Sequence, residues 1–327
     1  MAEPVTALGP GATPPPETFR ERVAYAAYRL AERVAVSLPE PWGRRLFGLG
    51  GTAAFHLAPG ARTVVQGNLR RVLGHAAGPE VLRAASREAF LSYSRYWYEA
   101  FRIRVMPDEE FMSRWHAEGA ENLEAAVKAG RGAIVALPHI GNWDAAGRWV
   151  HLRGWRITAV AELLRPERLF RMFLDNRRVM GMSIMPLYDD RDVGRELIRL
   201  LSEDEVIALV ADRDLKGRGV EVEMFGETRL MPSGPALLAL VAGSPLLPCA
   251  TYHTDDGWVV HIGAPLQIER TDVLRDDVTT LTRALASRFE RAIAAAPTQW
   301  HMFQPAWPDD RETATEAGRA DLLGSGL

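Results

Sequence analysis

The stretch GAIVALPHIGNWDAAGRWV, residues 132–150, decides the fold of this chain. Its apolar run AIVAL is ended by Pro138, and His139, a Gly-Asn pair and Asp144 follow before an Ala-rich segment. An apolar run that stops at a proline predicts a buried strand, and the Ala-rich segment favours a helix. In open α/β sheets, ligands bind at the carboxyl ends of the strands. We therefore predict a catalytic centre at this strand end, with His139 and Asp144 as its reactive groups.

The composition of the 327-residue chain is that of a folded globular protein, with 47% hydrophobic and 25% charged residues. A formal net charge of −3 gives no overall basic field, so we expect no nucleic-acid partner. Cys249 is the only cysteine, which excludes an internal disulfide and favours a reducing cytoplasmic setting. The first residues lack the basic and apolar regions of a signal peptide, and no run reaches the roughly 18 apolar residues of a transmembrane helix.

Apolar runs alternate with helical patterns after residue 115, and this alternation predicts one α/β domain with a central β-sheet flanked by helices. The expected strands are 133–137, 157–161, 182–186, 206–211, 246–252 and 258–262. The expected helices of this part are 118–129, 166–179, 191–201, 236–242 and 271–295.

The first third of the chain is predicted to be helical and to belong to the same domain. We expect the domain to cover 17–308, with a helical part, 17–115, and an α/β catalytic core, 116–308. Residues 1–16 are rich in Pro, Gly and Ala, which predicts disorder, and the charged, then Gly/Ser-rich residues 309–327 predict a flexible tail. The helical patterns of the first part are 18–38, 62–73 and 79–103.

Two of these helices leave alternatives open. Helix 18–38 places Phe19, Val23 and Leu30 at helical spacing with arginines between them. A basic amphipathic helix can lie on an anionic membrane, or it can pack on the domain and expose its arginines to water. Helix 79–103 carries a row of aromatic residues that either belongs to the core or lines a site for a lipid tail.

A histidine followed five residues later by an acid occurs at His75, His116 and His139, but only His139 follows a predicted strand and a proline. A neutral imidazole can deprotonate a hydroxyl while a carboxylate on its other ring nitrogen fixes the tautomer. With no protein nucleophile nearby, the attacking oxygen is a substrate alcohol, and an acyl donor such as a thioester completes the transfer. The alternative is a buried structural histidine. The chain has no HExxH or CxxC pattern, so we expect no metal and no other cofactor.

The segment LPHIGNWD resembles the HxxxxD block of the lysophospholipid and glycerolipid acyltransferases. Three further blocks follow in order, AELLRPERLFRMFLDNRRVMGMSIMPL, LVADRDLKGRGVEVEMFGE and MPSGPALLALVAGSPLLPC, and they narrow the resemblance to the bacterial lipid A late-acyltransferase superfamily. Within it, the ADRDLKGRGVEVEMFG stretch and the abundance of Arg make the chain most similar to the actinobacterial phosphatidylinositol mannoside acyltransferases. The matching blocks cover residues 132–248 and extend more weakly over most of the chain.

The resemblance implies a glycerolipid acyltransferase-like fold and roles for the residues of each block. His139 is then the base that deprotonates a sugar hydroxyl, and Asp144 orients its ring. Glu162, in AELLRP, faces the acceptor sugar. Arg177, in LDNRR, lies at the active-site groove, with Arg178 as the second candidate.

The remaining blocks supply the rest of the expected site. In ADRD, Asp212 or its neighbour Asp214 completes the polar network around His139. Asn142 contacts substrate from the turn, and Ser233, in MPSGP, shapes the acyl-donor side. Simpler explanations remain for some of these residues. Glu162 and Arg177 can form a surface ion pair, and Ser233 can belong to an ordinary turn.

The expected reaction is the transfer of a long-chain acyl group, such as palmitoyl, from acyl-CoA to a mannose hydroxyl of a phosphatidylinositol mannoside. The resemblance places the protein peripherally at the cytoplasmic face of the cell membrane, against the inner-membrane surface. Backbone N–H groups near Gly141 or Arg177 are candidates to stabilise the oxyanion. The alternatives are transfer to another glycolipid or a lipid A precursor, an esterase or thioesterase, and a lipid-binding module without catalysis.

Overall fold

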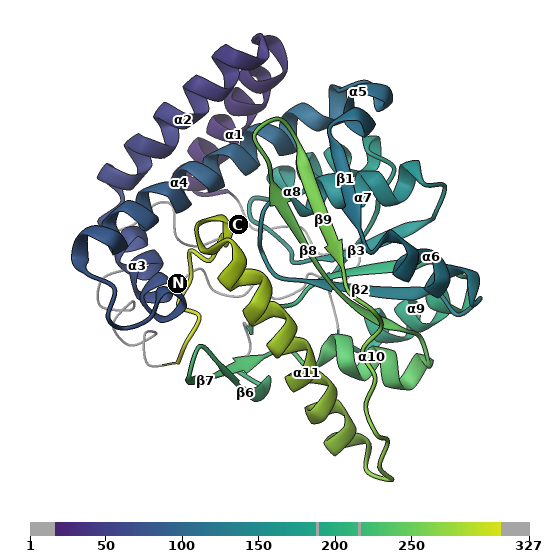
Figure 1. Ribbon diagram of the computed structural model, residues 1–327. Helices are drawn as coiled ribbons and strands as arrows, with labels where there is room; N and C mark the ends of the chain where they lie inside the picture. Colours follow the sequence, from purple (N-terminus) through teal and green to yellow (C-terminus); the bar gives the residue numbers. More distant parts are fainter. Residues whose placement is uncertain (1–16, 188–189, 215–216, 309–327) are drawn as a thin grey trace.

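A computed structural model gives the structure of residues 17–187, 190–214 and 217–308 (Figure 1). The terminus 1–16 and the tail 309–327, predicted to be disordered and flexible, lie outside the described residues. A layer of N-terminal helices lies beside an α/β part in which helices flank a seven-stranded sheet (Figure 1). The predicted fold class, a single α/β domain with an N-terminal helical segment, is confirmed.

The N-terminal layer is built around α4, against which α1, α2 and α3 pack. A capping box starts α1, because Thr18 Oγ1 accepts the backbone N–H of Glu21 and the Glu21 carboxylate accepts the backbone N–H of Thr18. Helices α2, α3 and α4 each have a proline in the first turn, where no backbone donor is needed. The bounds are α1 (Phe19–Ser37), α2 (Glu40–Leu57), α3 (Pro59–Leu73), α4 (Pro79–Arg102), η1 (Ile103–Val105) and α5 (Asp108–Ser113).

The strands of the main sheet lie in the order β1-β9-β8-β2-β5-β3-β4. Strand β2 is at the centre, parallel to both β8 and β5, and every one of its residues is buried. A separate antiparallel hairpin is formed by β6 and β7. The bounds are β1 (Trp115–Glu118), β2 (Ala133–Leu137), β3 (Ile157–Ala161), β4 (Ser183–Pro186), β5 (Val206–Val210), β6 (Val220–Met224), β7 (Glu227–Met231), β8 (Leu246–His253) and β9 (Trp258–Ile262).

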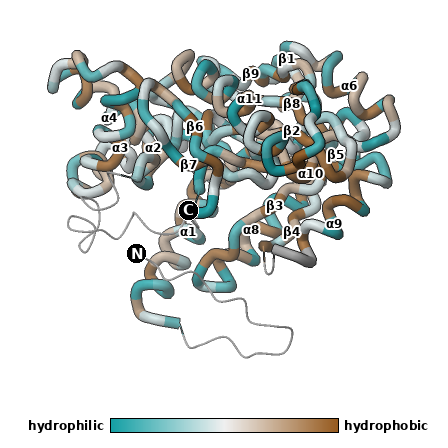
Figure 2. The backbone as a smooth tube through the Cα atoms, turned by 90° about the horizontal axis from the view of Figure 1, so that it is seen from below, coloured by the Kyte–Doolittle hydropathy of each residue, from teal (hydrophilic) through white to brown (hydrophobic). Residues whose placement is uncertain are grey.

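The two faces of the sheet have separate cores, because successive residues of a strand face opposite sides. Ile134 and Ala136 of β2 pack with side chains of α9, α10 and α11, whereas Val135 and Leu137 pack with those of α6 and α7. In Figure 2, α10 and the neighbouring strands β3 and β4 are among the most hydrophobic segments. The bounds are α6 (Ala120–Lys128), α7 (Trp143–Leu152), α8 (Glu167–Val179), α9 (Asp190–Ser202), α10 (Gly234–Ala242), α11 (Leu274–Ala295) and η2 (Pro297–Gln299).

The strands that the sequence did not predict are β1 and the two strands of the hairpin β6–β7, and the helices that it did not predict are α2, α5 and the 3₁₀ helices η1 and η2. Strand β1 has only four residues, too few for a clear pattern. The hairpin turns at Phe225 and Gly226, which have φ angles of 55° and 75°. Positive φ at both central residues suits a tight hairpin turn, in which Asn-Gly is the usual pair. Phe in the first position therefore conceals the turn from a sequence pattern.

Exposed apolar side chains mark the outer faces of α1 and α2. Tyr25, Tyr28 and Ala35 pack α1 against the domain, whereas Phe19 and Leu30 are 81% and 64% exposed. The packed face of this helix is therefore not the apolar row noted in the sequence. Helix α2 has a similar exposed row, formed by Trp42, Leu46, Leu49 and Leu57.

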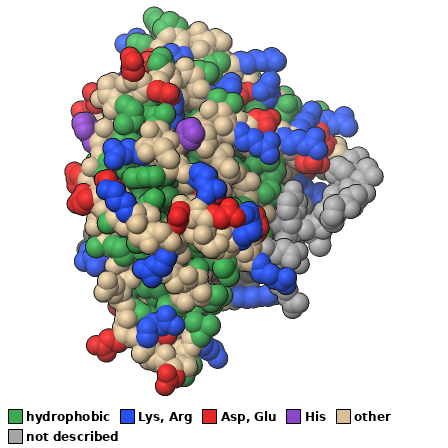
Figure 3. Space-filling model, turned by 90° about the vertical axis from the view of Figure 1, so that its right-hand side faces the viewer, with side chains coloured by type: hydrophobic (Ala, Val, Ile, Leu, Met, Phe, Trp, Pro, Cys, Tyr) green, Lys and Arg blue, Asp and Glu red, His purple; other side chains and the backbone are tan. Residues whose placement is uncertain are grey.

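Other surfaces of the domain differ from these outer faces. On the side seen in Figure 3, basic, acidic and apolar side chains are mixed. Within the ranges that the structure describes, every helix is too short or too polar to cross a bilayer.

Candidate active site

Three neighbouring parallel strands, β2, β5 and β3, bring polar residues to one edge of the sheet. His139 follows β2, Asp212 follows β5, and Glu162 follows β3. Leu137 is paired with Val210, so β2 and β5 end level with each other. Residues far apart in the sequence thus meet at the carboxyl ends of the strands, the usual place for a ligand in an α/β sheet.

The imidazole of His139 is bound to the carboxylate of Asp212. Nδ1 of His139 lies 2.5 Å from Oδ1 of Asp212, while Oδ2 accepts the backbone N–H of His139 (3.0 Å) and the indole N–H of Trp300 (2.8 Å). Burial acts to raise the pKa of Asp212, but the imidazole and these hydrogen bonds lower it below its ordinary value. The carboxylate is therefore ionised and can only accept, so Nδ1 carries a proton and Nε2 is left as the base.

Asp144 does not contact His139, which corrects the orienting role expected of it. Its carboxylate accepts hydrogen bonds from Nε of Arg177 (2.7 Å) and from the hydroxyl of Tyr96 (2.9 Å). The physical reason is its position in the first turn of α7, where its side chain meets α4 and α8, whereas His139 precedes the helix and meets β5. Burial acts to lower the pKa of Arg177, but Asp144 raises it above its ordinary value, so the guanidinium stays charged.

The ion pair considered between Glu162 and Arg177 is replaced by two other pairs. Oε2 of Glu162 lies 3.0 Å from a guanidinium nitrogen of Arg213, and Arg177 is taken by Asp144. The side chain of Glu162 is 43% exposed, at the entrance of the site. Arg178, the second candidate for the groove, lies on the exposed side of α8.

A cavity extends from His139 into the interior on the α7 side of the sheet. Tyr93, Tyr96 and Trp97 of α4 belong to its wall, so part of the aromatic row of helix 79–103 lines the cavity and part lies in the core. The polar end is lined by His139, Asp144, Glu162, Arg177, Arg213 and His301. The interior is apolar and is lined by Leu123, Val135, Leu137, Trp149, Ile157, Val210, Cys249, Val260 and Ile262, among others.

Three residues expected to contact substrate lie outside this cavity. Asn142 is fully buried, and its side chain caps α7 through one atom and donates to Glu99 through the other (3.0 Å). The carboxylate of Asp214 accepts the backbone N–H of Gly219, in the connection to β6. Ser233 precedes α10, which packs on the other face of the sheet. These expectations are corrected, because helix capping, a turn and the strand topology place the three side chains elsewhere.

Residues 299–301, called the QWH segment below, pack against the turn that follows His139. The backbone N–H of Gly141 donates to the carbonyl of Gln299 (3.1 Å), and the backbone N–H of His301 donates to the carbonyl of His139 (2.7 Å). Gly141 has a φ of +58°, and a Cβ there would lie 1.9 Å from the carbonyl oxygen of Thr251. The turn therefore requires glycine.

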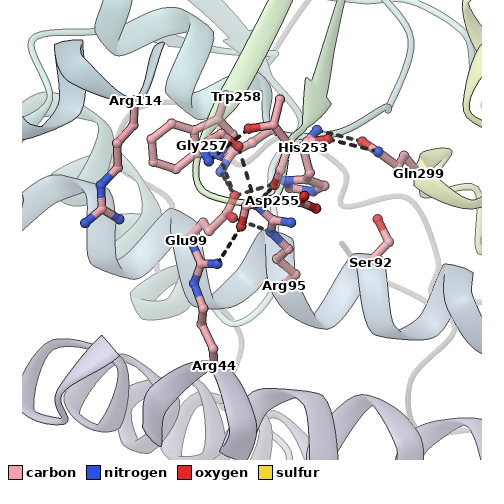
Figure 4. Close-up of polar contacts among 12 residues, drawn as sticks. Arg44, Ser92, Arg95, Glu99, Arg114, His253, Asp255, Gly257, Trp258 and Gln299 are labelled. Atoms are coloured by element: carbon pink, nitrogen blue, oxygen red, sulfur yellow. Dashed lines mark hydrogen bonds and ion pairs between the residues drawn. The ribbon is translucent and has the colours of Figure 1, made fainter. Parts of the chain in front are cut away.

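A buried carboxylate lies behind this turn (Figure 4). Glu99 accepts hydrogen bonds from Arg95 and Trp258, both at 2.6 Å, and from Asn142, and it lies 3.1 Å from Nδ1 of His253. Burial acts to raise the pKa of Glu99, but His253 and Arg95 lower it below its ordinary value. This ionised group ties α4, β8 and β9 to the start of α7. Within the described ranges, no group of three His, Cys, Asp or Glu residues could hold a metal ion.

The site also contains functional side chains that sequence reasoning did not identify. Tyr96 and Arg213 bind the acids of the site, Trp300 binds Asp212, and His301 lines the cavity. Each lies on an element whose neighbours are set by tertiary packing. The only sequence indication was the density of aromatic residues in helix 79–103 and around QWH.

The family model of the bacterial lipid A biosynthesis acyltransferases matches residues 20–308. The chain therefore belongs to this family and is an acyltransferase, as the four sequence blocks predicted. It is 41% identical over 304 residues, 91% of both chains, to the phosphatidylinositol mannoside acyltransferase of Mycobacterium tuberculosis strain CDC 1551. The corresponding protein of strain H37Rv is 40% identical over the same length. The phosphatidylinositol mannoside acyltransferase of Mycolicibacterium smegmatis is 37% identical over 290 residues, 88% of this chain and 93% of its own.

Proposed function

We propose that the protein transfers a long-chain acyl group, such as palmitoyl, from acyl-CoA to a mannose hydroxyl of a phosphatidylinositol mannoside. The acceptor is taken from the names of relatives that share 37–41% identity with it over about nine-tenths of the chain. The observation that carries the proposal is the cavity, because it joins a histidine base to a long apolar interior. A thioester at His139 can extend its acyl chain into that interior.

The apolar interior favours a long acyl chain over a short one. Each buried CH₂ group contributes about 0.8 kcal/mol, so a chain that fills the cavity binds far more tightly than an acetyl group. The CoA moiety then remains at the mouth of the cavity, where the exposed carboxylate of Glu162 pairs with the largely buried Arg213. The acceptor sugar approaches the same mouth, and a carboxylate beside a guanidinium suits its hydroxyl groups.

The proposed chemistry is a direct transfer without an acyl-enzyme. The mannose oxygen attacks the thioester carbonyl carbon as its proton passes to Nε2 of His139. Asp212, hydrogen-bonded to Nδ1, stabilises the imidazolium that forms. The C–S bond then breaks, and the CoA thiolate takes the proton from His139, so the base is regenerated.

The outer faces of α1 and α2 supply a means of reaching a lipid acceptor. Phe19 and Trp42 are 81% and 62% exposed, and Arg20 and Arg45 are exposed beside them. Apolar side chains can enter the headgroup region, and each well-placed cation adds roughly 1 kcal/mol of attraction to an anionic surface. We propose a peripheral location at the cytoplasmic face of the cell membrane.

The reaction is tested with labelled palmitoyl-CoA offered to phosphatidylinositol mannosides, to lipid A precursors, and to buffer alone. We expect acyl phosphatidylinositol mannoside to be the main product and His139→Ala to abolish it. His75→Ala is the matched control, since His75 also precedes an acid by five residues but is 66% exposed outside the cavity. Product formation by His139→Ala would exclude the mechanism. Equal release of free acid without an acceptor would instead indicate a thioesterase.

The membrane contact is tested separately with vesicles that contain phosphatidylinositol. Trp42→Asp combined with Leu46→Asp should lower vesicle binding while transfer to a detergent-dispersed acceptor is retained. Vesicle binding that equals the wild type would exclude α2 as the contact.

A further inference from the structure

A second histidine, His301, lines the cavity beside His139. Its side chain is buried, and its ring packs against Tyr93 and Tyr96, with ring centroids 5.3 and 5.6 Å away. The indole of Trp143 contacts both imidazoles, with centroid distances of 5.4 Å to His139 and 6.0 Å to His301. Because the backbone N–H of His301 donates to the carbonyl of His139, the two histidines are held in a fixed relation.

The polar atoms of the His301 ring are used unequally. Nε2 lies 3.0 Å from Oγ of Ser92, in α4. Nδ1 is buried and has no hydrogen-bond partner among the residues that the structure describes. A buried polar group left unpaired destabilises the folded protein. The ring that carries this unpaired nitrogen lines the cavity.

The proton on the ring can be placed from its surroundings. Burial lowers the pKa of His301 well below its ordinary value, and the nearby His253 and His139 lower it further, while Glu99 and Asp212 act in the opposite direction. The imidazole is therefore neutral, with one donor and one acceptor nitrogen. The contact between the Ser92 hydroxyl and Nε2 fits either tautomer, and we assign the hydroxyl as its donor. Nδ1 then carries the proton.

The nearest acidic and imidazole groups do not use this donor. His253, whose ring centroid is 6.1 Å from that of His301, is directed to Glu99. Glu99 already accepts from Arg95, Trp258 and Asn142. Figure 4 shows Glu99 beside Arg95 and Trp258, and it shows the hydrogen bonds between His253 and Gln299. With this assignment, the Nδ1–H group is an uncharged donor on a ring that lines the polar end of the cavity.

We propose that His301 is a catalytic residue whose Nδ1–H donates a hydrogen bond to the thioester carbonyl oxygen as negative charge develops on it. This inference rests on the proposed function, since it assigns the oxyanion donor of that reaction. As the acceptor oxygen bonds to the carbonyl carbon, its proton goes to His139 and the C=O electron pair moves to the oxygen. When the C–S bond breaks, the carbonyl re-forms and the thiolate takes the proton. His301 neither gains nor loses a proton.

The test compares His301→Ala, His301→Asn and His301→Gln. An Asn side chain places an N–H group near the position of Nδ1, whereas a Gln side chain places it near Nε2. We expect kcat to fall 10²–10³-fold in the Ala variant, as for loss of one oxyanion donor, with little change in KM. The kcat of His301→Asn should be at least tenfold higher than that of His301→Ala, whereas the kcat of His301→Gln should not. His75→Asn, outside the cavity, should match the wild type.

Two further measurements separate this role from a structural one. Binding of a palmitoyl-CoA thioether analogue, which lacks the carbonyl oxygen, should be unchanged in the Ala variant, and thermal unfolding should confirm that each variant is folded. The inference is overturned if the Ala variant keeps kcat within threefold of the wild type, or if Gln restores activity as well as Asn. If the wild type cleaves the thioester but uses another acceptor, the proposed acceptor fails and the His301 comparison is made with that acceptor. If the wild type does not cleave the thioester, both proposals fail.

Discussion

Asp212 and Asp144 enter the active site from different elements, one after β5 and the other in the first turn of α7. Both carboxylates are buried, but they have different partners. Asp212 accepts from an imidazole, a backbone N–H and an indole, whereas Asp144 accepts from a guanidinium and a phenol. The charge of Asp144 is permanently balanced by Arg177. Only Asp212 faces a group whose charge changes when a proton is transferred.

In the proposed reaction, this difference separates a carboxylate that assists proton transfer from one that holds the structure. A carboxylate already paired with Arg gains little when a neighbouring imidazole becomes charged, because its own charge is largely compensated. The Asp144–Arg177–Tyr96 group instead connects α7, α8 and α4 along the cavity wall. The comparison therefore predicts that the two acids respond differently to the same substitution.

The largest effect is expected from Asp212→Asn. An amide cannot stabilise the imidazolium and favours the wrong tautomer of His139, so kcat should fall by about 10⁴ at saturating substrates. The fall in kcat caused by Asp144→Asn should be at least tenfold smaller than the fall caused by Asp212→Asn. Asp214→Asn is the matched control, because Asp214 is two residues away and outside the cavity. Equal losses in the first two variants would contradict the assignment.

Asp144→Ala should have its main effect on stability. Removing the acid leaves Arg177 as a buried cation without its partner, which typically costs 3–5 kcal/mol. Because the Arg177 side chain is 21% exposed, we expect a smaller loss of about 2–4 kcal/mol in the free energy of unfolding in urea. The double variant with Asp144→Leu and Arg177→Leu should recover part of this lost free energy of unfolding. A loss in the double variant equal to the sum of the single losses would show that the pair is not coupled.

Trp300→Phe removes one hydrogen-bond donor, the indole N–H, from the surroundings of Asp212. The ring is largely retained, but the N–H bond to Oδ2 is lost. A hydrogen bond to a charged group contributes about 1.5–3 kcal/mol, so we expect kcat to fall at least tenfold. Loss of a donor to the ionised form also raises the pKa of Asp212 toward its ordinary value. A kcat within threefold of the wild type would contradict this role of the indole.

The smallest effect concerns His301, the imidazole without a carboxylate partner in the described chain. Its folded-state pKa is lowered, so it contributes stability above its unfolded pKa of about 6.5 and loses it as the pH falls below that value. The slope is at most about 1.4 kcal/mol per pH unit. His301→Asn should flatten the dependence of unfolding free energy on pH between about 6.5 and 5, and an unaltered slope would show that the histidine is not buried as a neutral group.

The sequence could predict the elements whose pattern is local. Strands β2 and β3 were placed to the residue, because strands buried on both faces are continuous apolar runs. The same pattern placed His139 at the carboxyl end of β2, where the structure has it. Strand β1 and the hairpin β6–β7 were missed, since four residues and a Phe-Gly turn leave no local pattern.

Local sequence patterns could not predict the hydrogen-bond partners of the site residues, because these partners depend on strand order. Only the family resemblance placed Asp212, with Asp214 as the other candidate, near His139. Asp144 is near His139 in sequence, yet Asp212 is the residue in contact, since β5 pairs with β2. Trp300 follows Asp212 by 88 residues and reaches it through the packing of the C-terminal segment. The close spacing of His139 and Asp144 in the chain therefore did not indicate a hydrogen bond between them.

The packing of the QWH segment also sets when the site can form during synthesis. The chain is made from its N-terminus, and early parts fold first. Strands β2 and β5, with His139 and Asp212, leave the ribosome well before Trp300 and His301, whose N–H groups complete the hydrogen bonding of that pair. A nascent chain therefore holds a sheet with an incompletely fixed base. The hydrogen bonding of the His139–Asp212 pair is therefore completed only after residues 299–301 have left the ribosome.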